Sequence, residues 1–123
     1  MIATTILSFL NEKGVDNDRA LLYSYITLKR RHTMKVYKFY NDPGHGWLAV
    51  KRKELIELGV IGQISRYSYQ RGGTVYLEED GDASRFINAY VAKGLCATVK
   101  DFPYESKYSE KNSPIRSYES FKV

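Results

Sequence analysis

The segment from Asn41 to Trp47 reads NDPGHGW and holds the residues best suited to chemistry. Asp42 and His45 lie three positions apart across a turn, so the carboxylate could orient the imidazole as a general base. Glycines on both sides of His45 would let a ligand approach the backbone. A tight turn in which His45 makes a structural hydrogen bond explains the same residues. We favour that interpretation and assign no catalytic residue, because no serine or cysteine nucleophile stands in a recognisable motif.

A second polar cluster is the acidic run from Glu78 to Asp82. Its carboxylates, together with His45, would suit a divalent cation. The run lacks the ligand periodicity of an EF-hand, and two histidines with one cysteine give no zinc spacing. A solvated turn that places Asp82 as the cap of a helix accounts for it. We therefore expect no metal, and without a phosphate-binding glycine motif we expect no nucleotide cofactor.

Tyrosine is unusually frequent, at 11 of 123 residues. Tyrosine suits binding surfaces because it offers apolar area and a hydroxyl at low entropic cost. Tyrosines and arginines between residues 66 and 76 would form a face that stacks on bases and binds phosphate, as RNA-binding sheets do. The candidate binding residues are Asp42, His45, Trp47, Arg66, Tyr67, Tyr69, Arg71 and Tyr76. The candidate nucleic-acid contacts are Lys51, Arg52 and Lys53.

A hairpin must position the tyrosines. Gly72-Gly73 stands between two strand-like runs and predicts a two-residue loop with a type I′ turn. The register then pairs Tyr69 with Tyr76, and all three tyrosines of this region share one face. Val75 and Leu77 fall on the opposite face and are the core candidates.

The other elements follow from apolar spacing and turn residues. The predicted helices cover residues 2–13, about 16–31, 51–58 and 83–93, and the predicted strands cover 35–40, 47–50, 64–71, 74–79 and 95–100. Gly14, Gly59 and Gly94 each follow a helix and are expected to have positive φ. The predicted fold class is α+β: a small, mostly antiparallel sheet (β-β-α-β-β-α-β) with helices on one face, preceded by an N-terminal helical pair.

Composition sets the organisation of the chain. We expect an N-terminal helical arm over 1–33, an α+β core over 34–101, and an extended or disordered tail over 102–123, where no apolar period is found. The net charge of +5 is spread along the chain and gives only mild attraction to polyanions. A single cysteine, no apolar run of about 18 residues and no signal-peptide pattern predict a cytoplasmic protein without a membrane span.

Four strings in this order, DPGHGWLAV, ELIELGV, ISRYSYQ and TVYLEED-x-DA, resemble a group of small uncharacterised proteins from phages and other bacterial mobile elements. The resemblance implies a context: an accessory protein made in a bacterial cytoplasm, of a kind that often binds and blocks host factors. The leading hypothesis is therefore a non-enzymatic protein that binds a host protein, in host takeover or anti-defence. The alternatives are a single-stranded RNA-binding protein that uses the tyrosine and arginine face, and a small hydrolase or metal enzyme around Asp42 and His45.

Overall fold

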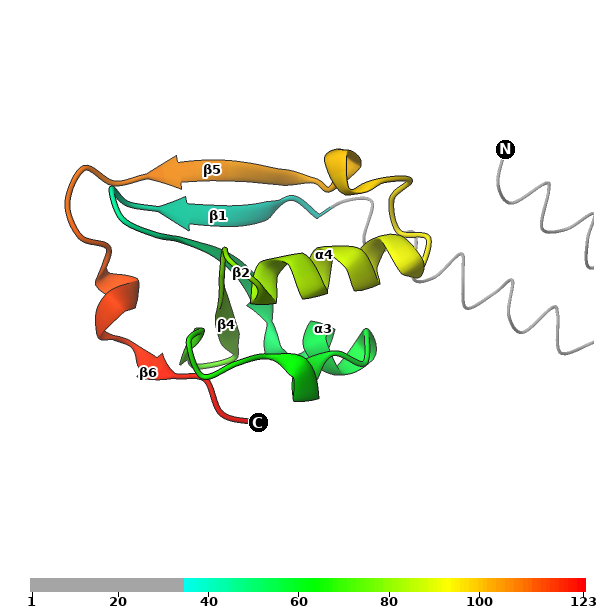
Figure 1. Ribbon diagram of the computed structural model, residues 1–123, viewed down its shortest axis with the longest axis horizontal. Coiled ribbons are helices and arrows are strands. Elements are labelled where there is room, and N and C mark those ends of the chain that lie inside the picture. The colour runs from blue at the N-terminus through cyan, green and yellow to red at the C-terminus, as the bar shows by residue number, and fades with distance from the viewer. Residues whose placement is uncertain (1–34) are drawn as a thin grey trace, which may run out of the picture. The chain divides into compact units, whose positions relative to one another are not determined.

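The computed structural model describes residues 35–123 (Figure 1), and residues 36–123 form one compact unit. The predicted N-terminal helical pair and Gly14 lie outside the described residues. The sheet strands are β1 (Tyr37–Asn41), β2 (Gly46–Lys51), β3 (Tyr69–Arg71), β4 (Thr74–Glu78), β5 (Tyr104–Tyr108) and β6 (Glu119–Ser120). The α-helices are α3 (Arg52–Glu57) and α4 (Asp82–Ala92), and the 3-10 helices are η1 (Ile61–Gln63), η2 (Val99–Asp101) and η3 (Pro114–Ser117). The predicted α+β class is confirmed.

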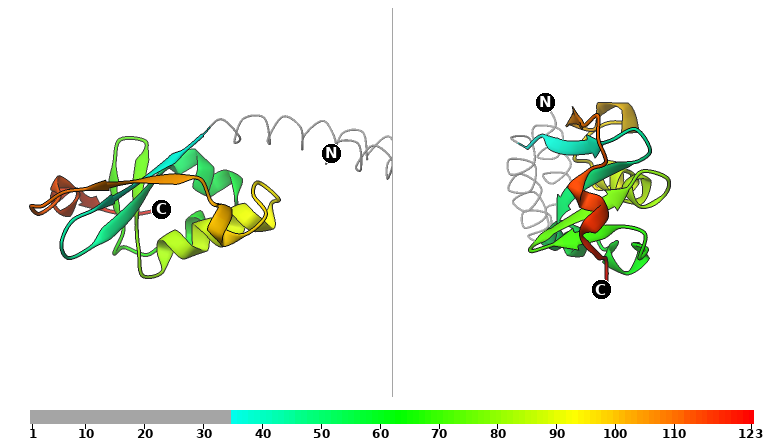
Figure 2. Two further views of the ribbon diagram at one scale, coloured as in Figure 1. Left: turned by 90° about the horizontal axis from the view of Figure 1, so that it is seen from above. Right: turned by 90° about the vertical axis from the view of Figure 1, so that its left-hand side faces the viewer.

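The six strands form one mixed sheet in the order β5-β1-β2-β4-β3-β6. Only the β1–β5 pair is parallel, and the other neighbours in the sheet are antiparallel. The sheet is strongly twisted, as sheets of L-residues are: β1 and β5 run across the view of Figure 1, whereas β4 runs nearly perpendicular to them. Figure 2 shows the same twist from two further directions.

The core lies between the two helices and the face of the sheet on which they pack. We call this face of the sheet the helix face. Tyr37 of β1 is at its centre, with ring centroids 5.5 Å from Phe86 and 5.7 Å from Tyr90 of α4. Its hydroxyl donates a 2.6 Å hydrogen bond to the buried carboxylate of Glu54 in α3. Both helices therefore pack on the same face of the sheet, as predicted.

The hairpin register is confirmed over Tyr69–Arg71, but the strand predicted over 64–71 is too long, because residues 64–68 form a turn and not a strand. Tyr69 pairs with Tyr76, and Val75 and Leu77 point to the helix face, where both are buried. The predicted type I′ turn is wrong. A type I′ turn has a positive φ at both central residues, whereas only Gly72 has one, at +59°. Positive φ at the first central position alone is the pattern of a type II′ turn, which also matches the twist of the strands.

Two helix ends are also confirmed by their glycines. Gly59 follows α3 with φ +72°, and Gly94 follows α4 with φ +76°. Leu95 folds back after Gly94, where its N–H donates to the carbonyl of Tyr90 at 3.2 Å and its side chain is buried. The strand predicted over 95–100 is therefore wrong, since this stretch turns and then forms η2.

The C-terminal segment 102–123 differs from the expected extended or disordered tail. It provides β5, η3 and β6, and its side chains Phe102, Ile115 and Phe121 are buried. These apolar residues are widely spaced and enter different parts of the molecule, so no period links them in the sequence. Within residues 35–123, no helix is long and apolar enough to cross a membrane.

Candidate functional site

The loop between β1 and β2 is built around the carboxylate of Asp42. Its Oδ1 accepts hydrogen bonds from the backbone N–H groups of Gly44 and His45, both at 3.0 Å, which is an Asx-type turn. The backbone N–H of Asp42 donates to the His45 carbonyl at 2.9 Å. The bond between the two candidate residues thus comes from the His45 backbone rather than from its ring.

Asp42 also holds the C-terminal segment. Its Oδ2 accepts from Ser113 N at 2.8 Å and from Arg116 Nε at 2.7 Å, while Arg116 Nη2 donates to Oδ1 at 2.8 Å. The Arg116 guanidinium, helped by three backbone N–H groups, holds the pKa of Asp42 far below its usual range, although desolvation opposes this. Asp42 therefore stays charged at neutral pH, and both of its carboxylate oxygens accept from donors other than the His45 ring.

The two glycines beside His45 have packing roles. A Cβ on Gly44 would lie 2.8 Å from Arg116 Nη2, so this glycine makes room for the guanidinium. A Cβ on Gly46 would overlap the Phe39 ring. These contacts account for both glycines without ligand access to the backbone.

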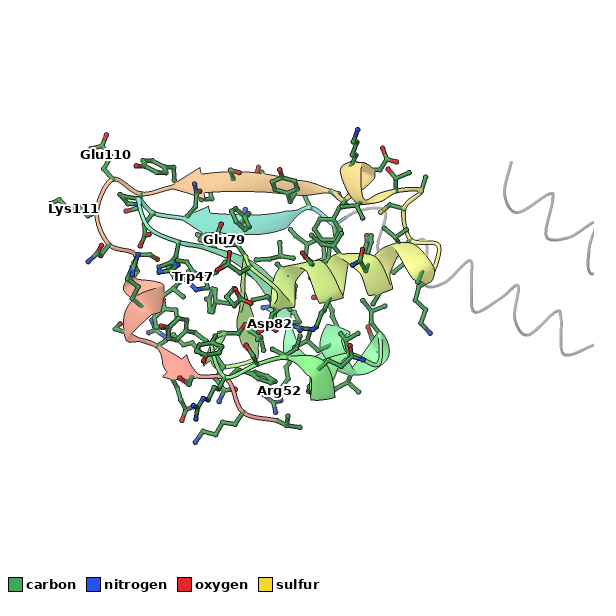
Figure 3. All side chains as sticks on the ribbon, viewed as in Figure 1. Trp47, Arg52, Glu79, Asp82, Glu110 and Lys111 are labelled. Carbon is green, nitrogen blue, oxygen red and sulfur yellow. The ribbon has the colours of Figure 1, made fainter. Side chains whose placement is uncertain are left out.

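Trp47 lies on the sheet face opposite the helices and is still only 3% exposed. The Arg116 guanidinium covers it, with Cζ 5.6 Å from the ring centroid, a cation–π arrangement. Tyr69 meets the Trp47 ring edge-on at 6.2 Å, and the His45 ring lies 6.0 Å away. Figure 3 shows Trp47 close to the η3 segment, which carries Arg116.

These side chains surround an open hollow of about 460 Å³. We call it the aromatic hollow, and its lining residues are His45, Trp47, Tyr67, Tyr69, Glu78, Asp80 and Arg116. Tyr67 projects at its rim and is 73% exposed. The hollow brings together four of the residues predicted from the sequence.

Carboxylates form one side of the aromatic hollow. Glu78 Oε2 accepts from Asp80 N at 2.7 Å and Oε1 accepts from Asp82 N at 2.9 Å, so Glu78 satisfies the start of α4. Asp80 lies in the exposed turn between β4 and α4. The positive charge of Arg116 is matched by Asp42, which leaves Glu78 and Asp80 to give the hollow a net negative charge.

Asp82 has a different role from the predicted helix cap. Its side chain is fully buried, and Oδ2 accepts from Ser65 N at 3.0 Å, Ser65 Oγ at 2.7 Å and Ser68 Oγ at 2.6 Å. Arg85 Nη1 donates to Oδ1 at 2.7 Å. Asp82 therefore fixes the loop that carries Tyr67, while the residue before the helix is Gly81.

The other candidates of the tyrosine face lie outside the aromatic hollow. Tyr76 packs on Tyr118, with ring centroids 5.3 Å apart, and Arg71 lies over the same Tyr118 ring at 5.0 Å. Arg66 is exposed in the turn beside Tyr67. The C-terminal segment thus covers the part of the face that was expected to be open.

The basic run lies at the other end of β2 from Trp47. Arg52 donates to Gln70 Oε1 at 3.2 Å and to the carbonyl of Lys122 at 2.9 Å, and its Cζ lies 5.3 Å from the centre of the Phe121 ring. Arg52 therefore holds the C-terminal residues Phe121 and Lys122 in place. Lys51 and Lys53 are exposed, and Lys51 Nζ donates to Thr74 Oγ1 at 3.3 Å.

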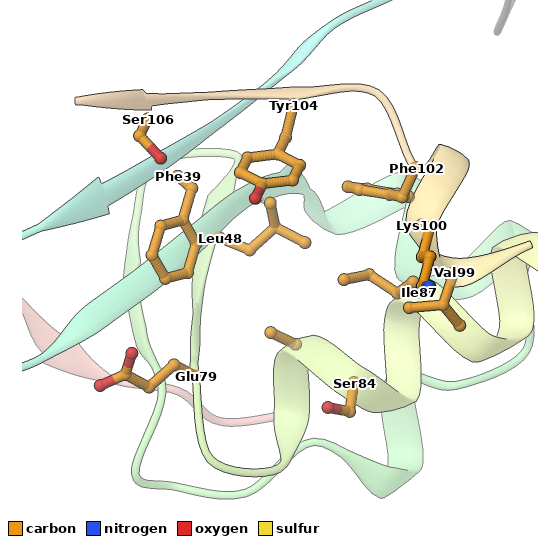
Figure 4. Close-up of a pocket in the computed structure, with 11 residues that line it drawn as sticks. Phe39, Leu48, Glu79, Ser84, Ile87, Val99, Lys100, Phe102, Tyr104 and Ser106 are labelled. Carbon is orange, nitrogen blue, oxygen red and sulfur yellow. The ribbon is translucent and has the colours of Figure 1, made fainter.

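A second hollow, of about 530 Å³, lies on the helix face between α4 and the β1–β5 edge (Figure 4). Its walls are mainly apolar, and they include Phe39, Ile87 and Phe102. Tyr104 and Ser106 of β5 project toward it. No candidate residue from the sequence lines this hollow.

Sequence reasoning missed Arg116 as a lining residue of the aromatic hollow, and it grouped Glu78 and Asp80 with His45 only as carboxylates that could hold a cation. Arg116 lies 74 positions from Asp42, and no local pattern marks it. In the described part of the chain, no group of three or more His, Cys, Asp or Glu side chains is arranged to hold a metal ion. Family models, curated proteins and solved structures gave no match to this chain.

Proposed function

We propose that this chain is a small accessory protein of the phage or mobile-element type that binds a host protein through the aromatic hollow. The observation that carries the proposal is the gathering of aromatic side chains from separate segments around one open hollow. A buried Trp47 floor with an exposed Tyr67 at the rim has the anatomy of an interface hot spot. The resemblance to mobile-element proteins supports a bacterial host as the source of the partner, and host takeover or inhibition of a host defence factor as the outcome.

The charge of the aromatic hollow suggests the chemistry of the partner. Glu78 and Asp80 face a space walled by Trp47, Tyr67 and Tyr69. Aromatic faces and carboxylates together attract a cationic side chain through cation–π and ionic contacts. The partner would therefore insert an arginine or lysine.

The nucleic-acid alternative draws less support from this geometry. A phosphate that approached Tyr67 or Tyr69 would meet the carboxylates of Glu78 and Asp80. Arg52 of the basic run already binds protein groups at the C-terminus. The two exposed lysines of the basic run, Lys51 and Lys53, lie at the opposite end of β2 from Trp47 and the aromatic hollow.

The hydrolase alternative requires Asp42 to orient the His45 ring. Asp42 instead accepts from Arg116, Ser113 and the loop backbone. His45→Ala tests this alternative directly. A complete loss of biological effect, with folding and partner binding preserved, would indicate catalysis.

The test is a pull-down from bacterial lysate with the tagged full chain, with and without nuclease. We expect a protein partner that survives nuclease treatment. Tyr67→Ala should reduce its affinity about 30-fold, the equivalent of about 2 kcal/mol for a hot-spot aromatic. Asp80→Lys should abolish binding of the cationic side chain.

The matched control is Glu110→Lys, which makes the same charge change in an exposed loop outside the aromatic hollow. It should bind as the parent does. A nuclease-sensitive complex would support the nucleic-acid alternative. Equal binding by all the variants would place the contact surface elsewhere on the molecule.

A further inference from the structure

Strand β5 forms one edge of the sheet. It pairs with β1, and within residues 35–123 no strand lies on its other side. All five of its residues, Tyr104 to Tyr108, are exposed. An edge strand of this kind is a template for pairing with another chain.

The hydrogen bonds at the two ends of the β1–β5 ladder show which backbone groups are open. Tyr37 N donates to the Pro103 carbonyl at 2.9 Å, and Ser109 N donates to the Asn41 carbonyl at 2.8 Å. Backbone groups alternate in direction along a strand, so the odd-numbered residues 103–109 face β1. The N–H and C=O groups of Tyr104, Ser106 and Tyr108 therefore point away from the sheet.

We propose that β5 pairs antiparallel with β5 of a second copy of this chain, which makes a two-fold homodimer with one continuous sheet. This inference is independent of the proposed host-protein contact. The strand sequence Tyr-Glu-Ser-Lys-Tyr is complementary to itself when it is reversed. With Ser106 on the two-fold axis, Glu105 lies opposite Lys107 of the second copy, and Tyr104 lies opposite Tyr108.

The open backbone groups fit this register. Ser106 on the axis and Tyr104 and Tyr108 at the strand ends are the residues whose N–H and C=O groups point outward. The Ser106–Ser106 pair and each Tyr104–Tyr108 pair can therefore exchange two backbone hydrogen bonds. The charged pairs fall between them, at positions where opposite side chains come closest. An isologous contact of this type closes after two copies and leaves no free β5 edge.

Charge selects this register over its neighbours. A shift of two residues in one direction places Glu105 opposite Glu105 of the second copy, and a shift in the other direction places Lys107 opposite Lys107. Like charges directly opposite each other are destabilising. Within one copy, the Glu105 carboxylate is 2.9 Å from Lys38 Nζ and 3.5 Å from Lys107 Nζ. It is therefore already held on the face opposite the helices, where it would meet the lysine of the second copy.

The tyrosines at the two ends of β5 add contact area. Tyr104 and Tyr108 are 55% and 62% exposed, and Tyr104 stands beside the second hollow (Figure 4). Cross-strand pairing would bring Tyr108 of the second copy next to Tyr104. Five-residue strand pairing alone buries less than a stable interface of about 1,200 Å², so the dimer should form in a concentration-dependent way.

The test is the mass of the full chain by light scattering and sedimentation, from about 1 µM to 1 mM, the range that resolves weak dissociation constants. We expect the mass to rise from 14.2 kDa to twice that value. Glu105→Lys and Lys107→Glu each place like charges across the axis, so each variant should stay monomeric where the parent is dimeric. The double variant, and an equimolar mixture of the two single variants, restore opposite charges and should recover the dimer.

Ser106→Pro tests the backbone part of the contact. Its N–H points outward, so proline is compatible with β1–β5 pairing but removes a donor at the axis. Circular dichroism should show an intact fold, with the dimer lost. A parent that remains monomeric throughout the concentration range would overturn the proposal, and so would dimers that persist in both Lys107→Glu and Ser106→Pro. Tyr67→Ala should leave the dimer unchanged, which separates it from the aromatic hollow.

Discussion

At the scale of single residues, two buried carboxylates, those of Asp42 and Asp82, hold the aromatic hollow together. Asp42 joins the β1–β2 loop to η3, and Asp82 joins α4 to the loop that carries Tyr67. Both side chains are fully buried and hydrogen-bonded on each oxygen. Buried charges are tolerated only with such partners, so each aspartate fixes the geometry around it.

Asp42→Asn should destabilise the protein at pH 7 and change its pH dependence. Because the folded state holds the pKa of Asp42 well below the ordinary 3.8, the ionised form contributes stability that is complete above pH 3.8. That contribution is lost as the pH falls through the lowered pKa. Urea unfolding at a series of pH values should therefore show a gap between parent and variant that narrows below pH 3.8.

Asp80→Asn is the matched control for Asp42→Asn, since it makes the same change in an exposed turn. Its unfolding curve should follow that of the parent at every pH. A gap between parent and Asp42→Asn that stays constant down to low pH would contradict the role of the Arg116 pair.

Asp82→Ala should lower the free energy of unfolding by about 3 kcal/mol, because it leaves Ser65 and Ser68 donors without an acceptor in a buried site. The loop bearing Tyr67 should become mobile, which hydrogen exchange at residues 65–68 would detect. Ser84→Ala, in the exposed part of the same helix, should change stability by no more than about 0.5 kcal/mol. Protection at residues 65–68 that is unchanged in Asp82→Ala would contradict this account.

At the scale of elements, the helix ends at Gly59 and Gly94 depend on local backbone geometry. Gly94→Ala should cost about 1 kcal/mol, because a Cβ is disfavoured at φ +76°. Gly62→Ala is the matched control: like Gly94, Gly62 has open space where a Cβ would stand, but its φ is not positive. Thermal unfolding should separate the two, and equal melting temperatures would mean that the αL conformation carries no cost here.

The elements that sequence reasoning identified correctly are those specified by neighbouring residues. The hairpin register follows from Gly72-Gly73 and strand alternation, and the ends of α3 and α4 follow from a glycine and the apolar residue after it. β5 was missed because its five residues are exposed on both faces and show no apolar side. Arg116 was missed for a related reason, since it reaches Asp42 through a contact 74 positions apart that no periodicity encodes.

At the scale of the whole described unit, the C-terminal segment closes the molecule. It adds β5 at one edge of the sheet and β6 at the other, and between them η3 crosses the face opposite the helices. Ile115 is buried there beside Tyr40, Tyr76 and Tyr118. Without this cover, the aromatic residues of that face would be exposed as one large apolar patch, which folded proteins rarely leave open.

Ile115→Ala should therefore lower the free energy of unfolding by about 3 kcal/mol, the usual cost of removing a buried aliphatic side chain and leaving a cavity. Val123→Ala makes a similar apolar truncation in the same segment at a residue that is 77% exposed, and should cost no more than about 0.5 kcal/mol. Trp47 is the single tryptophan, so its fluorescence shows directly whether the C-terminal segment still shields it from water. Deleting residues 110–123 removes Arg116 from its ring and should shift its fluorescence emission to the red. An unshifted emission in the deletion variant would mean that Trp47 stays buried without the C-terminal segment, and that this segment does not complete the aromatic hollow.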